Sequence, residues 1–330
     1  MPEPGYLTLF RSGELARRAE ALEARLAACD LCPRECGDNR LGGERGFCRA
    51  GSRPQVASVC GHHGEEPAIS GSRGSGTVFF SGCNLRCVYC QNHQISQGEA
   101  GARGPGVDCR SLAGDLLHLQ DGLGCHNVNF VSPSHFVPQM VRAVLEAAAM
   151  GFELPLVYNT SSYDSLATLK ALDGVVDIYL ADLRYASDRW AWRLSRAPGY
   201  RAHARAAIAE MYRQVGLLST DDDGVARSGL IVRLLVLPDG LAGSRESLTW
   251  LATEVSPEVT VSIMSQYHPA HRAGRVPSLR RTITRAEYDE VVDLLGNLGM
   301  ENGWVQGMGA DGDYLPDFDR DGHPFLVPPV

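Results

Sequence analysis

Residues 77–90 read TVFFSGCNLRCVYC, an apolar run that leads into three closely spaced cysteines. The run at 77–81 has the length and the β-branched and aromatic content of a buried strand. Cys83, Cys87 and Cys90 follow with the spacing C-x3-C-x2-C. Three thiols directly after a strand predict a metal centre at the carboxyl end of that strand.

Five more apolar runs of strand length follow, and segments with helical periodicity separate them. Continuous apolar strands that alternate with helices are typical of a parallel sheet buried on both faces. Six such units predict an α/β fold, a partial (β/α)6 barrel of the TIM type. The expected strands are 77–81, 127–131, 155–159, 176–181, 230–237 and 259–264, and the expected helices between them are 110–120, 136–150, 164–172, 202–216 and 244–255.

The flanking segments predict three regions. Residues 1–75 hold a predicted helix at 8–28, a small cysteine-rich metal-binding segment and a loop rich in Gly and Ser. Residues 76–270 form the predicted partial barrel. Residues 271–330, with a predicted helix at 284–298, form an extension that we expect to cap the barrel.

The second group of cysteines lies near the start of the chain. Cys29, Cys32, Cys36 and Cys48 have the spacing C-x2-C-x3-C-x11-C. A chain of 330 residues buries a core without disulfides, so such spacing favours metal ligation. Four thiolates suit either structural zinc or an auxiliary iron–sulfur cluster, and the sequence leaves both open. Because residues 29–50 lack an apolar core of their own, we expect metal binding and local folding to be coupled. The interpretation that this group only stabilises the fold, without chemistry, is favoured over a chemical role.

Composition narrows the class of protein further. Apolar residues make up 44% of the chain and charged residues 21%, which is ordinary globular composition. The net charge of -8 argues against a nucleic-acid partner, since such proteins usually carry a basic face. No apolar run reaches 18 residues, and charged residues interrupt the first twenty. We therefore expect a cytoplasmic protein with no membrane partner.

The number of ligands in the three-cysteine motif bears on its chemistry. Three thiolates leave one iron of a four-iron cluster without a protein ligand, which is typical of a cluster that binds something else. A zinc site would need a fourth donor, and His93 stands three residues after Cys90. The spacing favours iron–sulfur over zinc.

The motif in its context resembles the radical S-adenosylmethionine (radical SAM) superfamily. C-x3-C-x2-C after an opening strand, with Tyr89 directly before the third cysteine, carries the likeness. Residues 74–83 and Gln91-Asn92 resemble the PflX-like branch, relatives of pyruvate formate-lyase activating enzymes. Weaker matches that extend the resemblance from about residue 29 onward are 66–71, 126–129, 132–135, 157–159, 177–182, 263–267 and 302–306.

The resemblance implies cofactors and a mechanism. Cys83, Cys87 and Cys90 would hold a [4Fe-4S] cluster whose open iron is chelated by S-adenosylmethionine. One electron, from a donor such as flavodoxin or ferredoxin, would cleave the sulfonium to methionine and a 5′-deoxyadenosyl radical that abstracts hydrogen from a substrate. The residues that the resemblance implies as cofactor contacts are Tyr89, Ser132, Ser134, His135, Asp182, Arg184 and Arg233. Arg184 stands where the activating enzymes carry Lys, and the planar guanidinium changes the geometry offered to a carboxylate.

The substrate is open at this stage. One expectation is a partner protein, as for activating enzymes of glycyl-radical enzymes, and another is a small molecule or peptide. A non-catalytic metal scaffold or electron-transfer protein is the alternative of a different class, in which both cysteine groups only bind metal. Polar residues in the loop before the first predicted strand and at strand ends are candidate substrate contacts, since barrel enzymes place binding groups there. They are His62, His63, Glu65, Glu66, Asn127, Tyr158, Asn159, Tyr163, Gln266 and Tyr267.

Overall fold

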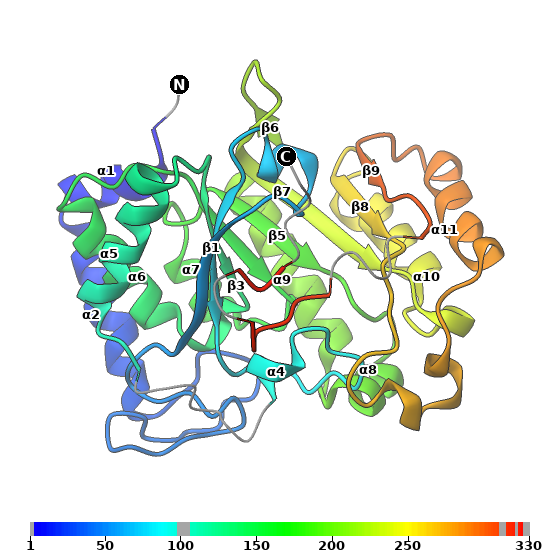
Figure 1. The fold of residues 1–330 in the computed structure, drawn as a ribbon, viewed down its shortest axis with the longest axis horizontal. Coiled ribbons are helices and arrows are strands. Elements are labelled where there is room, and N and C mark those ends of the chain that lie inside the picture. Colours follow the sequence, from blue (N-terminus) through cyan, green and yellow to red (C-terminus); the bar gives the residue numbers. More distant parts are fainter. Residues whose placement is uncertain (1–2, 98–105, 310–314, 321–322, 326–330) are drawn as a thin grey trace.

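The structure, a computed structural model, describes residues 3–97, 106–309, 315–320 and 323–325. It is a mixed α/β fold built on one nine-stranded sheet that is mostly parallel and open, with β1 and β9 at its edges (Figure 1). Within the predicted extension at 271–330, residues 310–314, 321–322 and 326–330 lie outside the described residues. The strands are β1 (Val56–His62), β2 (Ser75–Phe80), β3 (Val128–Val131), β4 (Leu156–Thr160), β5 (Ile178–Asp182), β6 (Ser219–Thr220), β7 (Ala226–Leu235), β8 (Thr260–Met264) and β9 (Gly303–Val305).

The six strands that the sequence predicts are present, and they are adjacent and parallel in chain order. β2 pairs with β3, β3 with β4, β4 with β5, β5 with β7 and β7 with β8. Because all of them run in one direction, their carboxyl ends meet at one edge of the sheet. The predicted alternation of buried parallel strands and helices is therefore confirmed.

Ahead of the Gly- and Ser-rich loop at 70–76, the structure has a strand at residues 56–62 that the sequence does not indicate. β1 forms there and pairs antiparallel with β2, with His62 opposite Ser75. Most of its residues are only half buried, so the strand lacks the apolar run that marks the others. After β1 the short helix α3 (Pro67–Ser70) turns inward, and Ala68 and Ile69 pack against apolar residues of β4, β5 and β7. The loop between β1 and β2 thus fills the space along the first half of the central strands.

The other edge of the sheet also carries a strand that the sequence does not indicate. β9 pairs parallel with β8, and Gly303 has a φ of 135°. A Cβ at Gly303 would stand 1.8 Å from the carbonyl oxygen of Val261, so only glycine fits. Beyond β9, Phe318 and Phe325 pack against Phe79 of β2, with ring centroids 5.2 and 6.0 Å away. This part of the chain, red in Figure 1, therefore crosses in front of the sheet.

The helix predicted at 8–28 is two helices, α1 (Gly5–Arg11) and α2 (Glu14–Ala24). Gly13 separates them with a φ of 76°, a conformation that ends a helix and that glycine adopts readily. α1 and α2 pack on α6, and the Tyr6 hydroxyl donates to the Leu154 carbonyl at 3.1 Å. The remaining helices include α4 (His93–Ser96), α5 (Cys109–Leu117), α6 (Val137–Ala148), α7 (Leu166–Ala171), α8 (Asp188–Ser195), α9 (Tyr200–Val215), α10 (Ser244–Trp250) and α11 (Arg285–Asn297).

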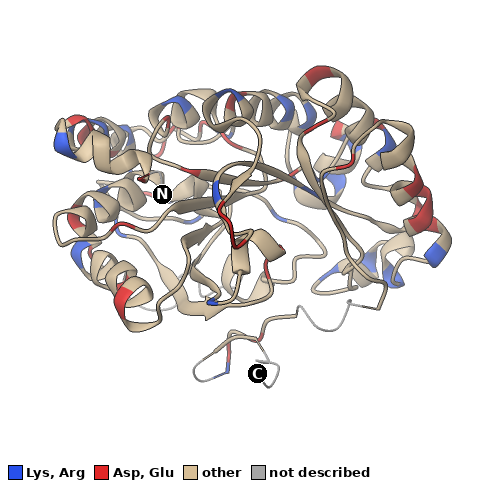
Figure 2. Ribbon diagram, turned by 90° about the horizontal axis from the view of Figure 1, so that it is seen from above, with Lys and Arg blue, Asp and Glu red and all other residues tan. Residues whose placement is uncertain are grey.

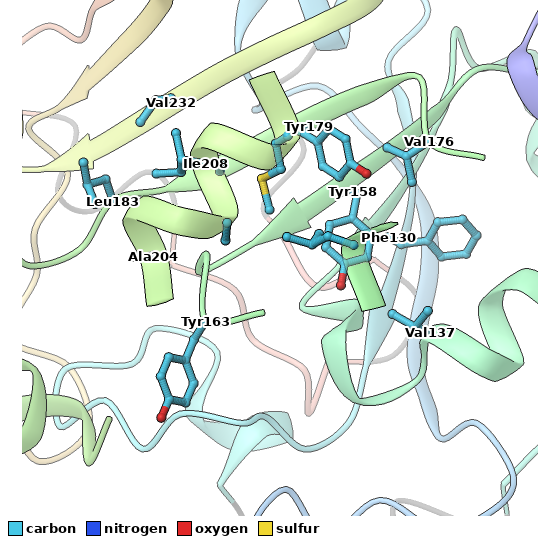
Figure 3. Packing of buried hydrophobic residues seen from close by; sticks show 14 of the residues in the cluster. Phe130, Val137, Tyr158, Tyr163, Val176, Tyr179, Leu183, Ala204, Ile208 and Val232 are labelled. Carbon is cyan, nitrogen blue, oxygen red and sulfur yellow. The ribbon is translucent and has the colours of Figure 1, made fainter. Parts of the chain in front are cut away.

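The main core lies between the sheet and these helices. Figure 3 shows Phe130, Tyr158 and Tyr179 on the helix-facing side of neighbouring strands, with the Tyr158 and Tyr179 rings 5.8 Å apart. Acidic and basic residues are interspersed along the outer helices (Figure 2). Arg245 of α10 and Glu290 of α11 form an exposed ion pair at 3.0 Å. Among the described residues, no helix is long and apolar enough to cross a membrane.

Asp177 ties the start of the chain to the sheet and makes stability depend on pH. Its carboxylate accepts the backbone N–H groups of Gly5 and Leu156, both at 2.9 Å. Burial outweighs these donors and raises the pKa of Asp177 to about 6. The folded state then holds a proton that the unfolded state releases as the pH rises from about 4 to 6, so stability falls across this window.

We expect wild type to lose about 3 kcal/mol of unfolding free energy relative to the Asp177→Asn variant over that window. Urea unfolding of both proteins at several pH values measures this difference. A difference that stays constant with pH would contradict the prediction.

Candidate metal centre and adjoining cavity

The three-cysteine loop leaves the carboxyl end of β2 and is held on two sides. The Arg86 and Val88 N–H groups donate to the Ser195 and Leu194 carbonyls at the end of α8, at 2.9 and 2.8 Å. On the other side the Arg272 N–H donates to the Val88 carbonyl at 2.7 Å. The backbone of the loop is therefore held by α8 on one side and by Arg272 on the other.

Cys83, Cys87 and Cys90 line one cavity of about 110 Å³. Each sulfur has a hydrogen-bond donor nearby. The Leu85 N–H donates to Cys83 Sγ at 3.4 Å, and the Ser195 hydroxyl donates to Cys87 Sγ at 3.0 Å. The Cys90 Sγ lies 3.2 Å from the Ser96 hydroxyl. Such donors stabilise thiolates and tune the potential of an iron–sulfur cluster.

Charge at the three thiols also fits a metal cluster. Burial and the neighbouring Cys87 together raise the pKa of Cys83 to about 12. Burial and Cys87 also raise the pKa of Cys90. Thiolates crowded in this way need a cation to remain ionised. Among the described residues, no three His, Cys, Asp or Glu side chains converge on one point as ligands of a single ion would. In a four-iron cluster the three cysteines bind three different irons, so the residues fit such a cluster in a cavity that all three line.

Tyr89 lies in the wall of the same cavity. Its hydroxyl hydrogen-bonds the Tyr185 hydroxyl at 2.5 Å, and Tyr185 in turn contacts the Ser195 hydroxyl at 2.6 Å. The Tyr89 and Tyr267 rings meet edge to face at 5.8 Å. A chain of hydroxyls thus connects Tyr89 to the serine that donates to Cys87.

A second cavity of about 420 Å³ adjoins the first at the carboxyl ends of the strands. Several residues at or near strand ends line both cavities, so the two cavities share part of their walls. The shared residues are Gln91, Asn92, Ser132, Ser161, Arg184 and Leu235.

Arg233, near the end of β7, organises the charges of the larger cavity. Its guanidinium contacts Asp182 Oδ1 at 2.7 Å, Glu65 Oε2 at 3.1 Å and Asn159 Oδ1 at 2.7 Å. Arg184 pairs with the other oxygen of Asp182. Burial lowers the pKa of Arg233, but the nearby carboxylates outweigh burial and leave it raised, so the guanidinium stays charged. Residues from β1–β2, β4, β5 and β7 therefore meet in one network.

The structure brings many of the predicted site residues to these cavities. Arg184 and Ser132 face both of them. Those that line the larger cavity are His62, Glu65, Glu66, Ser132, Asn159, Asp182, Arg184, Arg233 and Gln266; those that line the smaller one are Tyr89, Ser132, Arg184 and Tyr267.

Two of the predicted cofactor contacts line neither cavity. The His135 Nε2 lies 2.9 Å from the Ser81 carbonyl, and burial lowers the pKa of His135 to about 4. Ser134 is buried, and its hydroxyl lies 3.5 Å from that of Thr160. After Ser132, which has a φ of 54°, the chain turns into a 3₁₀ helix that carries both side chains away.

Four predicted substrate contacts also line neither cavity. Tyr158 and Tyr163 belong to the core on the helix side, as Figure 3 shows, and their hydroxyls donate to Asp164 and to the Pro198 carbonyl. Asn127 hydrogen-bonds the Ser75 hydroxyl at 2.6 Å and the Ile69 carbonyl at 2.8 Å, which fixes α3. His63 is exposed. Their positions are explained by packing and hydrogen bonding.

The amino-terminal cysteines also lie together. Burial raises the pKa of Cys32 to about 12 and that of Cys36 to about 11, and the neighbouring thiols of the group contribute in each case. Burial raises the pKa of Cys48 as well, and the Arg40 guanidinium acts in the opposite direction. The four sulfurs are thus close enough to influence one another.

Arg40 is a buried cation beside this group. Its side chain is 1% exposed, and it donates to the Gly51 carbonyl at 2.6 Å and to the His135 carbonyl at 2.7 Å. One guanidinium nitrogen lies 3.9 Å from Cys29 Sγ. Among the described residues, no carboxylate pairs with it. A buried charge needs a counter-charge, and thiolates of a metal-bound Cys29 and Cys48 would supply it.

The cysteine segment is attached to distant parts of the chain. The Leu31 carbonyl accepts the Thr168 hydroxyl at 2.8 Å. Arg34 donates to the Asn84 carbonyl, at the start of the three-cysteine loop, and to the Arg196 carbonyl, both at 2.6 Å. The two cysteine groups therefore belong to one rigid corner of the fold, blue and cyan at the lower left and centre of Figure 1.

Sequence reasoning missed residues that act through the cysteines. Ser195 and Arg40 contact Cys87 and Cys29, but nothing in their local sequence marks them. Asn129 donates to Glu65 at 3.0 Å. The sequence could have indicated Asn129, because it stands two residues from Asn127 and side chains alternate along a strand.

Comparison with known proteins gives one relative and no family. No protein-family model matches the chain. The chain is similar to an uncharacterized protein of Methanocaldococcus jannaschii, with 28% identity over 270 residues that cover 81% of this chain and 73% of that protein. The relative's name states no activity, so the function has to be argued from the site itself.

Proposed function

We propose that the protein is a radical SAM enzyme with a partial-barrel fold of that type. The observation that carries the proposal is the small cavity lined by Cys83, Cys87 and Cys90, which adjoins a larger polar cavity at the carboxyl ends of parallel strands. A cluster there supplies, when bound and reduced, the electron that cleaves S-adenosylmethionine and so starts hydrogen abstraction.

The residues of the chain have defined tasks in this proposal. Ser195 and the Leu85 N–H hold the thiolates. Arg184 faces both cavities, so it is placed to bind an anionic group such as a carboxylate beside the cluster. Asp182 fixes Arg184 and Arg233 by accepting from both. The walls formed by Tyr89 and Tyr267 keep water from the reactive space.

The amino-terminal segment is a second metal centre in this proposal, either zinc or an auxiliary iron–sulfur cluster. The buried Arg40 supports it, because either four-thiolate centre is anionic and offsets the guanidinium. Cytoplasmic location and reduction by an acidic carrier such as flavodoxin or ferredoxin belong to the same proposal.

The alternative of a non-catalytic metal scaffold would use His93 as a fourth ligand. His93 Nδ1 lies 3.2 Å from the Cys90 carbonyl, and its ring stacks on that of His271 at 4.9 Å. This orientation favours the open site over the closed one.

Formation of 5′-deoxyadenosine tests the proposed function. The protein is purified and reconstituted without oxygen, mixed with dithionite and S-adenosylmethionine, and its products are separated by chromatography. We expect 5′-deoxyadenosine and methionine in equal amounts. If protein with a fully loaded cluster forms no 5′-deoxyadenosine, either alone or with the n-propylguanidinium described below, the result contradicts the proposal.

The hydrogen bond from Ser195 to Cys87 gives a second expected result. Ser195→Ala removes a donor that stabilises the more negative, reduced cluster, so the midpoint potential becomes more negative. The shift is about 40 mV, if the bond differs by ~1 kcal/mol between the two oxidation states of a one-electron couple. Electron paramagnetic resonance during a redox titration measures it. Ser187→Ala, at the start of the same helix, is the control, because Ser187 makes no side-chain capping bond. Equal potentials in the two variants would refute the assignment.

A further inference from the structure

The larger cavity contains more acidic than basic side chains. Glu65, Glu66 and Asp182 line it together with Arg184 and Arg233, so three carboxylates face two guanidinium groups. His62 also lines it, but burial lowers the pKa of His62 to about 4, so this ring is neutral near pH 7. With all carboxylates ionised, these groups carry one unbalanced negative charge.

Glu66 is the carboxylate that the protein itself satisfies least, although the Ser262 side chain hydrogen-bonds it. Glu65 accepts from Asn129 and Asn159 and pairs with Arg233, and Asp182 pairs with both arginines. Glu66 Oε2 is buried and has no hydrogen-bond partner among the described residues. Its nearest cation, a guanidinium nitrogen of Arg233, is 3.9 Å away and is already shared with Glu65.

An unfilled acceptor of this kind is costly unless a ligand completes it. Leaving a buried charged acceptor without a donor destabilises a protein, because the group has lost its water without gaining a partner. Burial raises the pKa of Glu66. The Arg233 guanidinium lowers it and the neighbouring Glu65 raises it, and the pKa remains raised, so Arg233 does not fully balance the ionised form. Asn129 Oδ1, in the same network, is a second acceptor without a donor. Asn129 lines neither cavity, so Glu66 Oε2 is the unpartnered acceptor that bears on a ligand in the larger cavity. It requires a donor group, and the unbalanced negative charge favours a cation.

We propose that Glu66 binds a cationic nitrogen, an ammonium or guanidinium group, of the molecule that occupies the larger cavity. Calling that molecule a substrate rests on the proposed function. Its binding to Glu66 does not depend on that function. Glu66 lines only the larger cavity, away from the three cysteines, and Arg184 lies where the two cavities meet. The cationic end of the ligand therefore occupies the part of the site remote from the cluster.

Binding of a matched pair of small probes tests this inference without any redox step. The full chain is loaded with its metals and saturated with S-adenosylmethionine, and no reductant is added. n-Propylguanidinium and its neutral analogue n-propylurea are titrated separately, and saturation-transfer NMR reports binding. We expect saturable binding of the guanidinium, and binding about tenfold or more weaker for the urea and for Glu66→Gln, since a buried charge partner is lost.

Glu290→Gln is the control, because Glu290 forms an exposed ion pair on α11. It should bind the guanidinium as wild type does, and thermal melting checks that Glu66→Gln is folded. Equal affinity for the two probes, equal affinity of wild type and Glu66→Gln, or no saturable binding would each overturn the inference. Guanidinium binding that is seen without S-adenosylmethionine but lost in its presence would also overturn the inference, because Glu66 would then bind the cofactor. None of these binding results bears on the formation of 5′-deoxyadenosine, so the two proposals can fail separately.

Discussion

Replacing Cys83, Cys87 and Cys90 by alanine together should abolish the iron–sulfur absorbance of that site and lower 5′-deoxyadenosine formation about a hundredfold or more, since the chemistry resides in the cluster. The three thiols line one cavity, and no other described cysteine does. Iron and sulfide content, visible absorbance and product chromatography measure the result together.

The matched control removes three cysteines elsewhere. Cys60, Cys109 and Cys125 replaced by alanine should leave both cluster and product formation near wild type. Because Cys60 and Cys125 are buried, the control loses some stability through small cavities. Formation of 5′-deoxyadenosine by the variant that lacks Cys83, Cys87 and Cys90 would contradict the proposed function. Equal loss in both variants would show that general instability is responsible.

Arg40→Met should destabilise the protein by about 3–5 kcal/mol, the cost of leaving buried charged or polar groups without partners. The substitution keeps an unbranched stem but lacks the guanidinium, so the Gly51 and His135 carbonyls lose their donor. It also removes the cation beside Cys29, so the metal content of the amino-terminal segment falls with stability. Urea unfolding and metal analysis measure the two effects.

Arg45→Met is the control for Arg40→Met, since Arg45 is an exposed arginine of the same segment. It should change stability little, because substitutions on the exposed surface usually do. An Arg40→Met protein with wild-type stability and metal content would refute the role of the buried guanidinium.

The repeating strands could be predicted because each is a continuous apolar run. The edge strands could not: β1 is half buried, and β9 has only three residues. A strand that is covered on one side and paired on one edge carries a weak signal. The break between α1 and α2 at Gly13 had a local signal, since glycine commonly ends a helix.

The site was predicted as a region better than as a set of side chains. Neighbours on a strand point to opposite faces, so Asn159 reaches the cavity and Tyr158 the core. Both faces of this sheet are covered, and the sequence does not tell which of the two neighbours points inward. Arg40 and Ser195 act over long separations in sequence, 95 residues from Arg40 to His135 and 108 from Ser195 to Cys87, which local patterns do not reveal.

The attachment of the amino-terminal cysteine segment has a consequence for the timing of biosynthesis. The Arg34 side chain donates to a backbone carbonyl 162 residues later in the chain, and the Leu31 carbonyl accepts from a hydroxyl 137 residues later. At ~5–20 residues per second, the ribosome needs on the order of 10–30 s to add that stretch. Throughout this interval the four nascent thiols exist without the contacts that later enclose them. If these thiols bind metal as we propose, delivery of metal to the growing chain, or protection of its thiols from oxidation, has to begin before translation ends.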